Sequence, residues 1–385
     1  MTKIKTADKP ETRRARRRFL KTAAVATAAG ATGMLAMPGV SRAQTTVLKM
    51  QGSWGAGDIL NNYAEEYVKI VNEMGGGRLK IDYLNAGAVV KPFEVQDAVS
   101  SGVLDAGHLV PAYWYGKNRA ASLFGTGPCW GWNAHQLLAW IYNGGGQQLY
   151  DELVQKILGL NIVGWFCMPM PTQPLGWFKK KPESADDLKN LKYRTVGLAS
   201  NVFQNMGLKV TQLPGGEIIP AMEKGVIDAF EYNNPTSDRR FGAQDVAKVY
   251  KLSSYHQSME VLEIIFNKTK FDSLPDEFKS ILKRAVQVAN SVNLWTAYVN
   301  YPKDLQALVE KDGVKVYRTP QSILQAQLNA WDKVVEQYSS DPFFKKVIDA
   351  QRAWAKDVAY YELLNATDYK LAYDHYYGKE QPLGF

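Results

Sequence analysis

The sequence predicts an α/β protein of two lobes with mixed β-sheets. Short β-rich runs alternate with amphipathic helical patterns through the first two-thirds of the chain beyond residue 44, which is typical of βαβ units. From Pro275 onward the pattern is mostly helical. One sequence unit also occurs twice in the chain, as expected if the two lobes are related. A chain of 385 residues is also long enough to divide into two cores.

The expected elements alternate along the chain. Strands are expected over 46–50, 79–84, 106–110, 162–168, 192–196 and 209–212, and helices over 60–74, 93–100, 134–142 and 147–158. One long helix is expected over 276–310, with others after Gln321. The tail is rich in Tyr, Trp and Ala at helical spacing, which indicates core packing or a subunit contact.

Residues 1–43 have the pattern of an export signal. Arg16-Arg17-Arg18-Phe19-Leu20-Lys21 matches the twin-arginine motif, an Ala-rich apolar run follows, and Ser41-Arg42-Ala43 suits signal peptidase. A membrane anchor is a poorer interpretation because the run is short and rich in Ala, Gly and Thr. We therefore expect a twin-arginine signal peptide and an exported protein.

The basic charge balance belongs to this signal. It holds 10 of the 46 Lys and Arg residues and 2 of the 38 Asp and Glu residues, which leaves 36 of each in the rest of the chain. The high pI therefore indicates no nucleic-acid or membrane footprint. Two cysteines, Cys129 and Cys167, could pair in an oxidising compartment or stay as separate buried thiols.

Residues 94–106 are echoed by residues 217–229. In both units an amphipathic helix is expected to end at a glycine, Gly102 or Gly225, which supplies a left-handed cap. A short strand follows and leads into a polar and aromatic cluster, at 111–115 and 230–235. Two related lobes would each present the carboxyl end of a strand, where ligands bind in open α/β sheets. Chance similarity of two common helix–strand joints is the alternative.

Residues 186–197 (Asp-Asp-Leu-Lys-Asn-Leu-Lys-Tyr-Arg-Thr-Val-Gly) resemble the signature of the solute-binding proteins of tripartite ATP-independent periplasmic (TRAP) transporters, the DctP-type superfamily. The match continues in register to residue 229, over about 45 residues. The wider pattern runs from Met50 to the C-terminal helices.

The resemblance implies a two-lobed clamshell of the periplasmic binding protein type, with hinge strands and long helices spanning the lobes. Lobe I is expected over 44–168 with a return segment near 260–300, and lobe II over 169–259. The C-terminal helices, about 301–385, would pack across the lobes. The lobes would close on a ligand by hinge motion. The resemblance also implies a periplasmic location and delivery of the ligand to membrane permease subunits.

The arginine of the signature, Arg194, is implied to clamp the ligand carboxylate. A guanidinium group offers a planar fork that matches a carboxylate and stays charged at any working pH. One arginine favours a monocarboxylate, or one carboxylate end of a larger acid.

A narrower resemblance points to the branch that binds 2-oxo acids with a cation. It implies that Gln173 contacts metal and ligand, that Glu231 coordinates the cation, and that Tyr232, where the branch has Trp, offers its carbonyl oxygen. The second acid of the branch is replaced by Gln257, unless a different register brings in Glu260. Such oxygen ligands suit Na⁺ or Ca²⁺. Without a cation, Gln173 and Gln257 would hydrogen-bond the ligand.

The expected ligand is a small 2-oxo or 2-hydroxy acid, with an aromatic or sugar acid as the alternative. Beside Gln173 and Arg194, the expected ligand-contacting residues are Tyr113, Tyr115, Trp177 and Asn234. Other aromatic residues that could line the pocket are Trp54, Phe203 and Phe230.

The alternatives from other functional classes are an exported enzyme and a ligand-sensing protein. An exported enzyme lacks support, because the four histidines have no HExxH spacing and the chain has no Gly-x-Ser-x-Gly elbow. We therefore expect no catalysis and no organic cofactor. A ligand-sensing partner of a signalling system would use the same clamshell. The C-terminal helices also suggest a homodimer.

Overall fold

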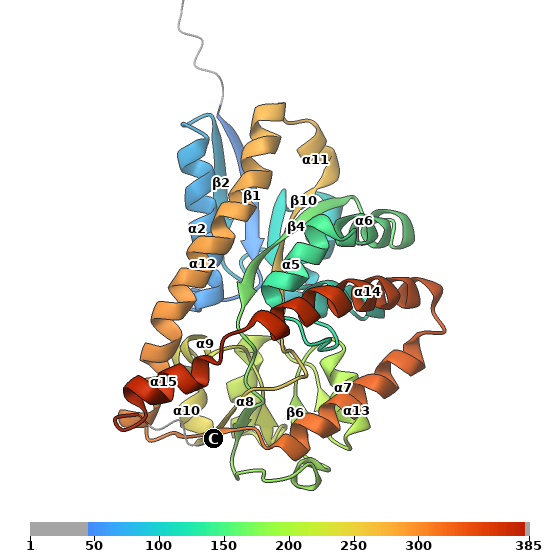
Figure 1. Ribbon diagram of the computed structural model, residues 1–385. Helices are drawn as coiled ribbons and strands as arrows, with labels where there is room; N and C mark the ends of the chain where they lie inside the picture. The colour runs from blue at the N-terminus through green and yellow to red at the C-terminus, as the bar shows by residue number, and fades with distance from the viewer. Residues whose placement is uncertain (1–44, 382–385) are drawn as a thin grey trace, which may run out of the picture. The chain divides into compact units, whose positions relative to one another are not determined.

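The computed structural model describes residues 45–381, and this part of the chain contains two β-sheets and many helices (Figure 1). The first sheet has five strands in the order β2-β1-β3-β10-β4, and the second has six in the order β11-β9-β5-β8-β6-β7. Both sheets mix parallel and antiparallel pairs, which confirms the expected fold class. The expected signal peptide lies outside the described residues, and the expected lobe boundaries stay a prediction.

The strands are short. Those of the first sheet are β1 (Thr46–Gly52), β2 (Leu79–Leu84), β3 (Ala106–Leu109), β4 (Ile162–Met170) and β10 (Glu260–Asn267). Those of the second sheet are β5 (Gly176–Phe178), β6 (Lys192–Arg194), β7 (Lys209–Thr211), β8 (Ala229–Phe230), β9 (Val249–Leu252) and β11 (Lys315–Arg318).

Each sheet contains the same three-stranded parallel unit. In the first sheet β1 lies between β2 and β3 and is parallel to both, and in the second β6 lies between β7 and β8 in the same way. The two echoed sequences form the last helix and strand of each unit, α3–β3 and α8–β8. Gly102 and Gly225 have φ of 82° and 68°, so each supplies the left-handed residue expected after its helix.

Two short segments of chain pass between the sheets, in addition to the longer connection from β10 to β11. One joins β4 to β5 and includes Gln173, and the other joins β9 to β10 and includes Gln257. They are hydrogen-bonded to each other, since Gln173 N donates to Gln257 O over 3.1 Å and Thr172 Oγ1 donates to Ser258 O over 2.9 Å. Side chains on these segments therefore lie at the junction of the two sheets.

The longest helix packs on elements of both halves of the chain. Helix α12 (Asp276–Glu310) contacts β4 of the first sheet, α2 and α9 (Figure 1). The other helices are α2 (Ile59–Met74), α3 (Val95–Ser101), α4 (Ser122–Gly125), α5 (Ala134–Asn143), α6 (Gly146–Asp151), α7 (Ala199–Asn205), α8 (Ile218–Glu223), α9 (Pro235–Arg240), α10 (Ala243–Val246), α11 (Lys268–Asp272), α13 (Gln321–Tyr338), α14 (Pro342–Asn365) and α15 (Tyr369–Tyr377).

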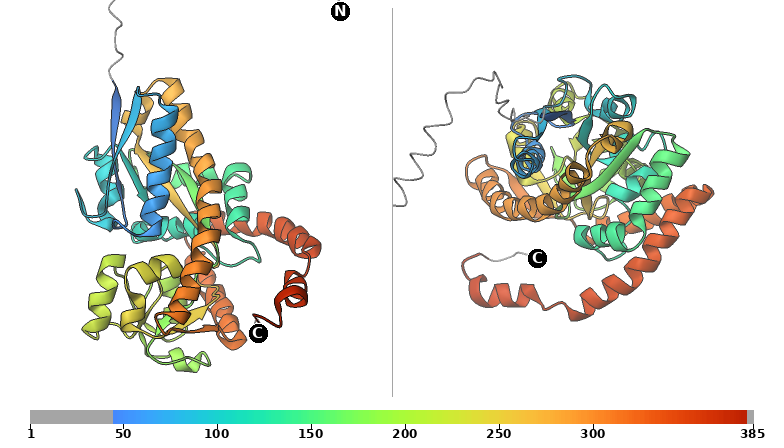
Figure 2. Two further views of the ribbon diagram at one scale, coloured as in Figure 1. Left: turned by 90° about the vertical axis from the view of Figure 1, so that its left-hand side faces the viewer. Right: turned by 90° about the horizontal axis from the view of Figure 1, so that it is seen from above.

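The C-terminal helices change character along their length. Helix α14 packs on α5 and has buried residues between Phe343 and Ala359, but its last turn and all of α15 bury no side chain. Figure 2 shows this end of the chain standing apart from the rest of the protein. Core packing, one of the two roles that the sequence left open, therefore applies to the first part of the tail, and the last part presents an exposed aromatic and aliphatic surface.

Two further observations concern the described residues as a whole. Cys129 and Cys167 are both free thiols, and Cys167 is buried. None of the helices between residues 45 and 381 is both long and apolar enough to cross a membrane.

Candidate functional site

Arg194 and Glu231 meet at one edge of the second sheet. Arg194 ends β6 and Glu231 follows β8, and these parallel strands pair in register, so both side chains leave at the carboxyl ends of adjacent strands. Arg194 Nη1 donates to Glu231 Oε1 over 3.0 Å and to its backbone oxygen over 2.9 Å. Arg194 Nε donates to the backbone oxygen of Leu213 over 2.8 Å. Both side chains of the ion pair are 1% exposed.

The segments between the sheets add three more polar side chains. These are Gln173, Gln257 and Glu260, none of which is more than 3% exposed. Gln173 Nε2 and Asn233 Nδ2 both donate to Glu260 Oε2, over 2.5 Å each. Burial raises the pKa of Glu260 to about 8, and the nearby charge of Glu231 adds to the rise. Gln257 and Glu260, between which the sequence left the choice open, thus both lie at the junction.

Several buried polar atoms of this cluster have no hydrogen-bond partner. They are Gln173 Oε1, Glu231 Oε2, His256 Nε2, and both Oε1 and Nε2 of Gln257. A buried polar atom without a partner costs about 1–3 kcal/mol, and native proteins contain few of them. Five such atoms around one buried ion pair indicate a place that a polar ligand or an ion completes.

The donor set decides which ion would fit. Three of the unpartnered atoms are oxygens, one from a carboxylate and two from amides, and such ligands suit hard cations. Within the part of the chain that the structure describes, no three His, Cys, Asp or Glu residues are grouped in a way that could hold a metal. A cation here would therefore depend on amide and carbonyl oxygens as well as on Glu231.

Tyr113, which the sequence predicts to contact the ligand, lies near this cluster. It is near enough to Arg194 and Glu260 for their charges to act on the pKa of its hydroxyl, which burial raises. Its ring lies 4.6 Å from that of Phe93 and 5.8 Å from that of Trp54, measured between centroids. Tyr115 is half-buried, and its hydroxyl accepts a hydrogen bond of 2.7 Å from Gln212.

Two residues expected to contact the ligand, Trp177 and Asn234, also contact other residues of the protein. Trp177 is fully buried in the hydrophobic core of the second sheet, where its ring stacks on Tyr250 at 4.2 Å and its Nε1 donates to Asp238 over 2.8 Å. Asn234 is the N-cap of α9, because its Oδ1 accepts from the backbone of Ser237 over 2.9 Å. These contacts hold both side chains in place, and their contact with a ligand stays a prediction.

Of the other aromatic residues expected to line the pocket, one lies in a hydrophobic core and two lie near the polar cluster. Phe230 belongs to the core cluster around Trp177, whereas the ring of Phe203 lies 5.1 Å from that of His256 and so borders the polar cluster. Trp54 contacts Tyr113 and the ring of His108, at 5.8 Å and 4.8 Å between centroids.

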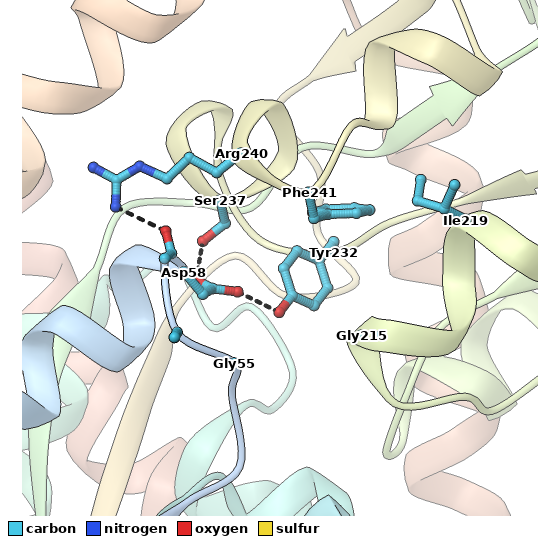
Figure 3. A pocket seen from close by; sticks show the side chains of 11 residues that line it. Gly55, Asp58, Gly215, Ile219, Tyr232, Ser237, Arg240 and Phe241 are labelled. Carbon is cyan, nitrogen blue, oxygen red and sulfur yellow. Dashed lines mark hydrogen bonds between the residues drawn. The ribbon is translucent and has the colours of Figure 1, made fainter. Parts of the chain in front are cut away.

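Tyr232 follows Glu231 in the sequence, and its side chain lines the pocket shown in Figure 3. Its ring lines this pocket of about 560 Å³ together with a glycine-rich loop over 55–58 and residues of α9. The guanidinium carbon of Arg194 lies 5.8 Å from the centroid of this ring. The hydroxyl group of Tyr232 donates to Asp58 Oδ2 over 2.5 Å. Ser237 Oγ donates to Asp58 Oδ1 over 2.7 Å.

Sequence reasoning missed Asp58 and His256. Asp58 precedes α2 and looks like an ordinary helix cap, a role it does fill by accepting from Leu60 N over 2.9 Å. His256 belongs to no recognisable sequence motif, and only its neighbour Gln257 indicated a site in this stretch of the chain. Neither position carries a motif, so only the folded chain brings them to the cluster.

Comparison with known proteins identifies the family of the chain. The model of the DctP family, described as bacterial extracellular solute-binding protein, family 7, matches residues 50–341. The monocarboxylate 2-oxoacid-binding periplasmic protein of Nostoc sp. is 33% identical over 363 residues, which cover 92% of this chain and 98% of that protein.

Solved structures show the same fold. A TRAP transporter solute-binding protein from Bordetella bronchiseptica, a dimer with calcium and picolinate in one active site, superimposes with a TM-score of 0.80 at 29% identity, covering 86% of this chain and 97% of that one. A TRAP periplasmic solute-binding protein from Pseudoalteromonas atlantica, with bound sodium and pyruvate, has a TM-score of 0.79 at 27% identity, covering 86% and 99%. The family match, the curated relative and the shared fold lead to one conclusion: this chain belongs to the bacterial extracellular solute-binding proteins of family 7.

Proposed function

We propose that this protein is the periplasmic receptor of a TRAP transporter and captures a small 2-oxo or 2-hydroxy monocarboxylate for delivery to the membrane permease. The observation that carries the proposal is the buried Arg194–Glu231 pair surrounded by unpartnered polar atoms. The relatives that bind pyruvate, picolinate and monocarboxylate 2-oxo acids support the ligand class.

Arg194 binds the carboxylate in this proposal. Its Nε and Nη1 are already hydrogen-bonded to Leu213 and Glu231, and Nη2 has no partner among the described residues. A ligand carboxylate therefore approaches the Nη2 side of the guanidinium group. A charge-assisted hydrogen bond there is stronger than one between neutral groups.

A cation is expected beside the carboxylate. Gln173 Oε1, Glu231 Oε2 and Gln257 Oε1 are the unpartnered oxygens that would hold it, with the carbonyl oxygen of Tyr232 as a fourth ligand. Na⁺ or Ca²⁺ suits this set. When bound, the cation would neutralise Glu231 and the ligand oxygens that face it. Because Gln257 supplies an amide where an acid would add charge, we expect weaker binding of a divalent ion.

The alternative ligand is an aromatic or sugar acid bound without metal. Tyr113, Trp54 and Phe203 border the polar cluster and give it partly aromatic walls. In that case Gln173 and Gln257 would hydrogen-bond the ligand directly.

The mechanism is capture without a chemical step. The acid enters between the expected lobes, Arg194 takes its carboxylate, and closure presents the loaded receptor to the permease. Export through the twin-arginine signal at residues 1–43 would place the receptor in the periplasm. A sensing protein of a signalling system would share this site and differ only in its membrane partner.

The receptor is also proposed to form a homodimer through its C-terminal helices. Eight large apolar or aromatic residues there are more than half exposed: Tyr360, Tyr361, Leu363, Leu364, Tyr369, Leu371, Tyr376 and Tyr377. Such a concentration of exposed apolar side chains is typical of a protein interface. A second copy of the chain is the proposed partner, and the dimeric Bordetella structure supports this choice.

Thermal denaturation of the exported chain with a set of organic acids tests the proposal. Pyruvate, lactate, picolinate and a sugar acid are compared in three buffers: one with sodium and calcium, one with sodium and EDTA, and one with EDTA and with choline in place of sodium. We expect pyruvate or lactate to raise the melting temperature, and removal of the cation to reduce the shift. No shift with any acid would contradict the receptor assignment, and equal shifts in all buffers would contradict the cation.

A further inference from the structure

We propose that His256 donates a hydrogen bond from Nε2 to an oxygen of the bound acid, and that Ser254 and Gln327 fix the tautomer that allows it. This inference rests on the proposed function and adds a ligand-binding residue to its site. His256 and Gln327 are fully buried, and Ser254 is 1% exposed.

The orientation of Gln327 is set by the backbone. Its Oε1 accepts a hydrogen bond of 2.8 Å from Tyr255 N, so its Nε2 faces Ser254 as the donor. Gln327 Nε2 donates to Ser254 Oγ over 2.7 Å. Trp331, one turn further along α13, donates from Nε1 to Tyr255 O over 2.7 Å. Helix α13 therefore holds the 254–256 segment through both backbone and side-chain contacts.

The Ser254 hydroxyl can then donate only to His256. Its oxygen accepts from Gln327 Nε2 at 2.7 Å and, more weakly, from His256 N at 3.5 Å. Among the described residues the one remaining partner is His256 Nδ1, at 2.5 Å. A serine hydroxyl has one proton and two lone pairs. With both lone pairs engaged, its proton goes to Nδ1, and the imidazole carries its own proton on Nε2.

His256 Nε2 faces the proposed ligand site. It lies 4.0 Å from Glu231 Oε2, and both atoms lack a hydrogen-bond partner. The next residue, Gln257, adds two more unpartnered atoms, and Phe203 packs against the imidazole ring. A separation of 4.0 Å is too long for a hydrogen bond, but one oxygen atom can lie within reach of both Nε2 and Oε2.

This arrangement favours particular ligand oxygens. A hydroxyl group can accept from Nε2–H and donate to Glu231, so a 2-hydroxy acid satisfies both atoms without a cation. A keto oxygen only accepts, and it would face the Glu231 carboxylate unfavourably unless a cation lies between them. Binding of pyruvate should therefore depend on the cation more strongly than binding of lactate.

Calorimetry with histidine variants tests the contact. His256→Phe keeps a planar ring but has no donor, and we expect it to lower affinity for the bound acid by about tenfold or more. His256→Gln places an amide nitrogen near the position of Nε2 and should recover most of that loss. His135→Gln, a change of an exposed histidine on α5, is the matched control and should bind like the wild type.

Nitrogen-15 NMR of the histidine rings tests the tautomer independently of binding. The chain has four histidines, so the His256→Phe spectrum assigns the ring by subtraction. We expect protonated Nε2 and unprotonated Nδ1 in the wild type, and loss of this preference in Ser254→Ala and Gln327→Met. Addition of the acid should shift the Nε2 signal.

The outcomes separate this inference from the proposed function. If the wild type binds none of the acids, the proposed function itself fails. If the wild type binds but His256→Phe binds equally well, the ligand contact is wrong and the receptor assignment stands. Protonated Nδ1 in the wild type would contradict the role of Ser254 and Gln327. If His256→Phe does not fold, His256→Gln and the shift of the wild-type Nε2 signal decide the question.

Discussion

The hydroxyl group of Tyr232 donates a hydrogen bond to the carboxylate of Asp58, and this contact joins elements of the two sheets. Asp58 is the N-cap of α2, which follows β1 of the first sheet, while Tyr232 lies two residues beyond β8 of the second. The residue before Tyr232 is Glu231, the ion-pair partner of Arg194. The contact therefore ties the proposed ligand site directly to the first half of the chain (Figure 3).

Removal of this hydroxyl should shorten the lifetime of the bound ligand. Tyr232→Phe keeps the ring and the backbone carbonyl but loses the hydrogen bond to Asp58, so we expect dissociation to accelerate by about tenfold. Stopped-flow fluorescence measures the rate. Tyr298→Phe, on the exposed surface of α12, is the control. Equal dissociation rates in the wild type and Tyr232→Phe would show that the contact does not retain the ligand.

The position of the Tyr232 ring should depend on the absence of a side chain at residue 215. A Cβ at Gly215 would lie 2.6 Å from Tyr232 Cε2 and 2.7 Å from its hydroxyl oxygen, whereas a Cβ at Gly216 would meet nothing within 4 Å. We expect Gly215→Ala to displace the ring and weaken ligand binding several-fold, and Gly216→Ala to have no effect. Titration calorimetry of the pair measures this, and equal affinities would contradict the assigned ring position.

Substitutions of Arg194 should separate its charge from its shape. Arg194→Lys keeps a positive charge near Glu231 but loses the fixed geometry, so we expect affinity for the acid to fall by about 10- to 100-fold. Arg194→Ala leaves Glu231 buried without its partner and should also lower the free energy of unfolding by about 3–5 kcal/mol. Calorimetry and urea denaturation measure the two effects. Unchanged affinity in Arg194→Lys would remove the guanidinium group from the ligand site.

Glu263 should make the stability of the protein depend on pH. It is fully buried, accepts from Trp114 and Tyr150 over 2.6 Å each, and burial raises its pKa to about 7. A raised carboxyl pKa means that folding favours the protonated form. The wild type is therefore expected to lose about 3 kcal/mol between pH 4.5 and pH 7 from this group, and little more above pH 7.

The matched variant for this prediction is Glu263→Gln, which cannot titrate. Urea denaturation of both proteins at intervals of pH gives the difference in their free energies of unfolding. That difference should change in favour of the variant as the pH rises from 4.5 to 7. A difference that is constant over this range would show that Glu263 has an ordinary pKa.

The exposed end of the chain should control the oligomeric state. Replacing Leu364 and Leu371 by Glu puts charges into the surface of α14 and α15 that we assign to the dimer. We expect a monomer by light scattering after gel filtration, with ligand affinity retained. Val226→Glu, an exposed apolar residue elsewhere, is the control and should leave the dimer intact. A wild type that is already monomeric would contradict the proposed dimer.

The candidate site was only partly predictable from the sequence. The signature pointed to Arg194, and the narrower resemblance pointed to Gln173, Glu231, Tyr232 and Gln257. Trp177 and Asn234 share the same stretches of sequence, yet their described partners are a core carboxylate and a helix end. Neighbouring residues of a short strand point to opposite sides of the sheet, and the residue that caps a helix has different surroundings from the residue before it. The sequence does not say which of these side chains faces the ligand.

Local patterns therefore determined the alternating elements, the long helix over 276–310 and the two echoed units, because period, caps and glycine positions are properties of neighbouring residues. Tertiary structure decided the rest. Strand β10 is buried along its whole length and so lacks the alternation by which a strand is recognised. Gln173 contacts Glu260, Tyr232 contacts Asp58 and Ser254 contacts Gln327, and these partners are between 73 and 174 positions apart. Such contacts depend on how the two sheets pack, and no local pattern records that.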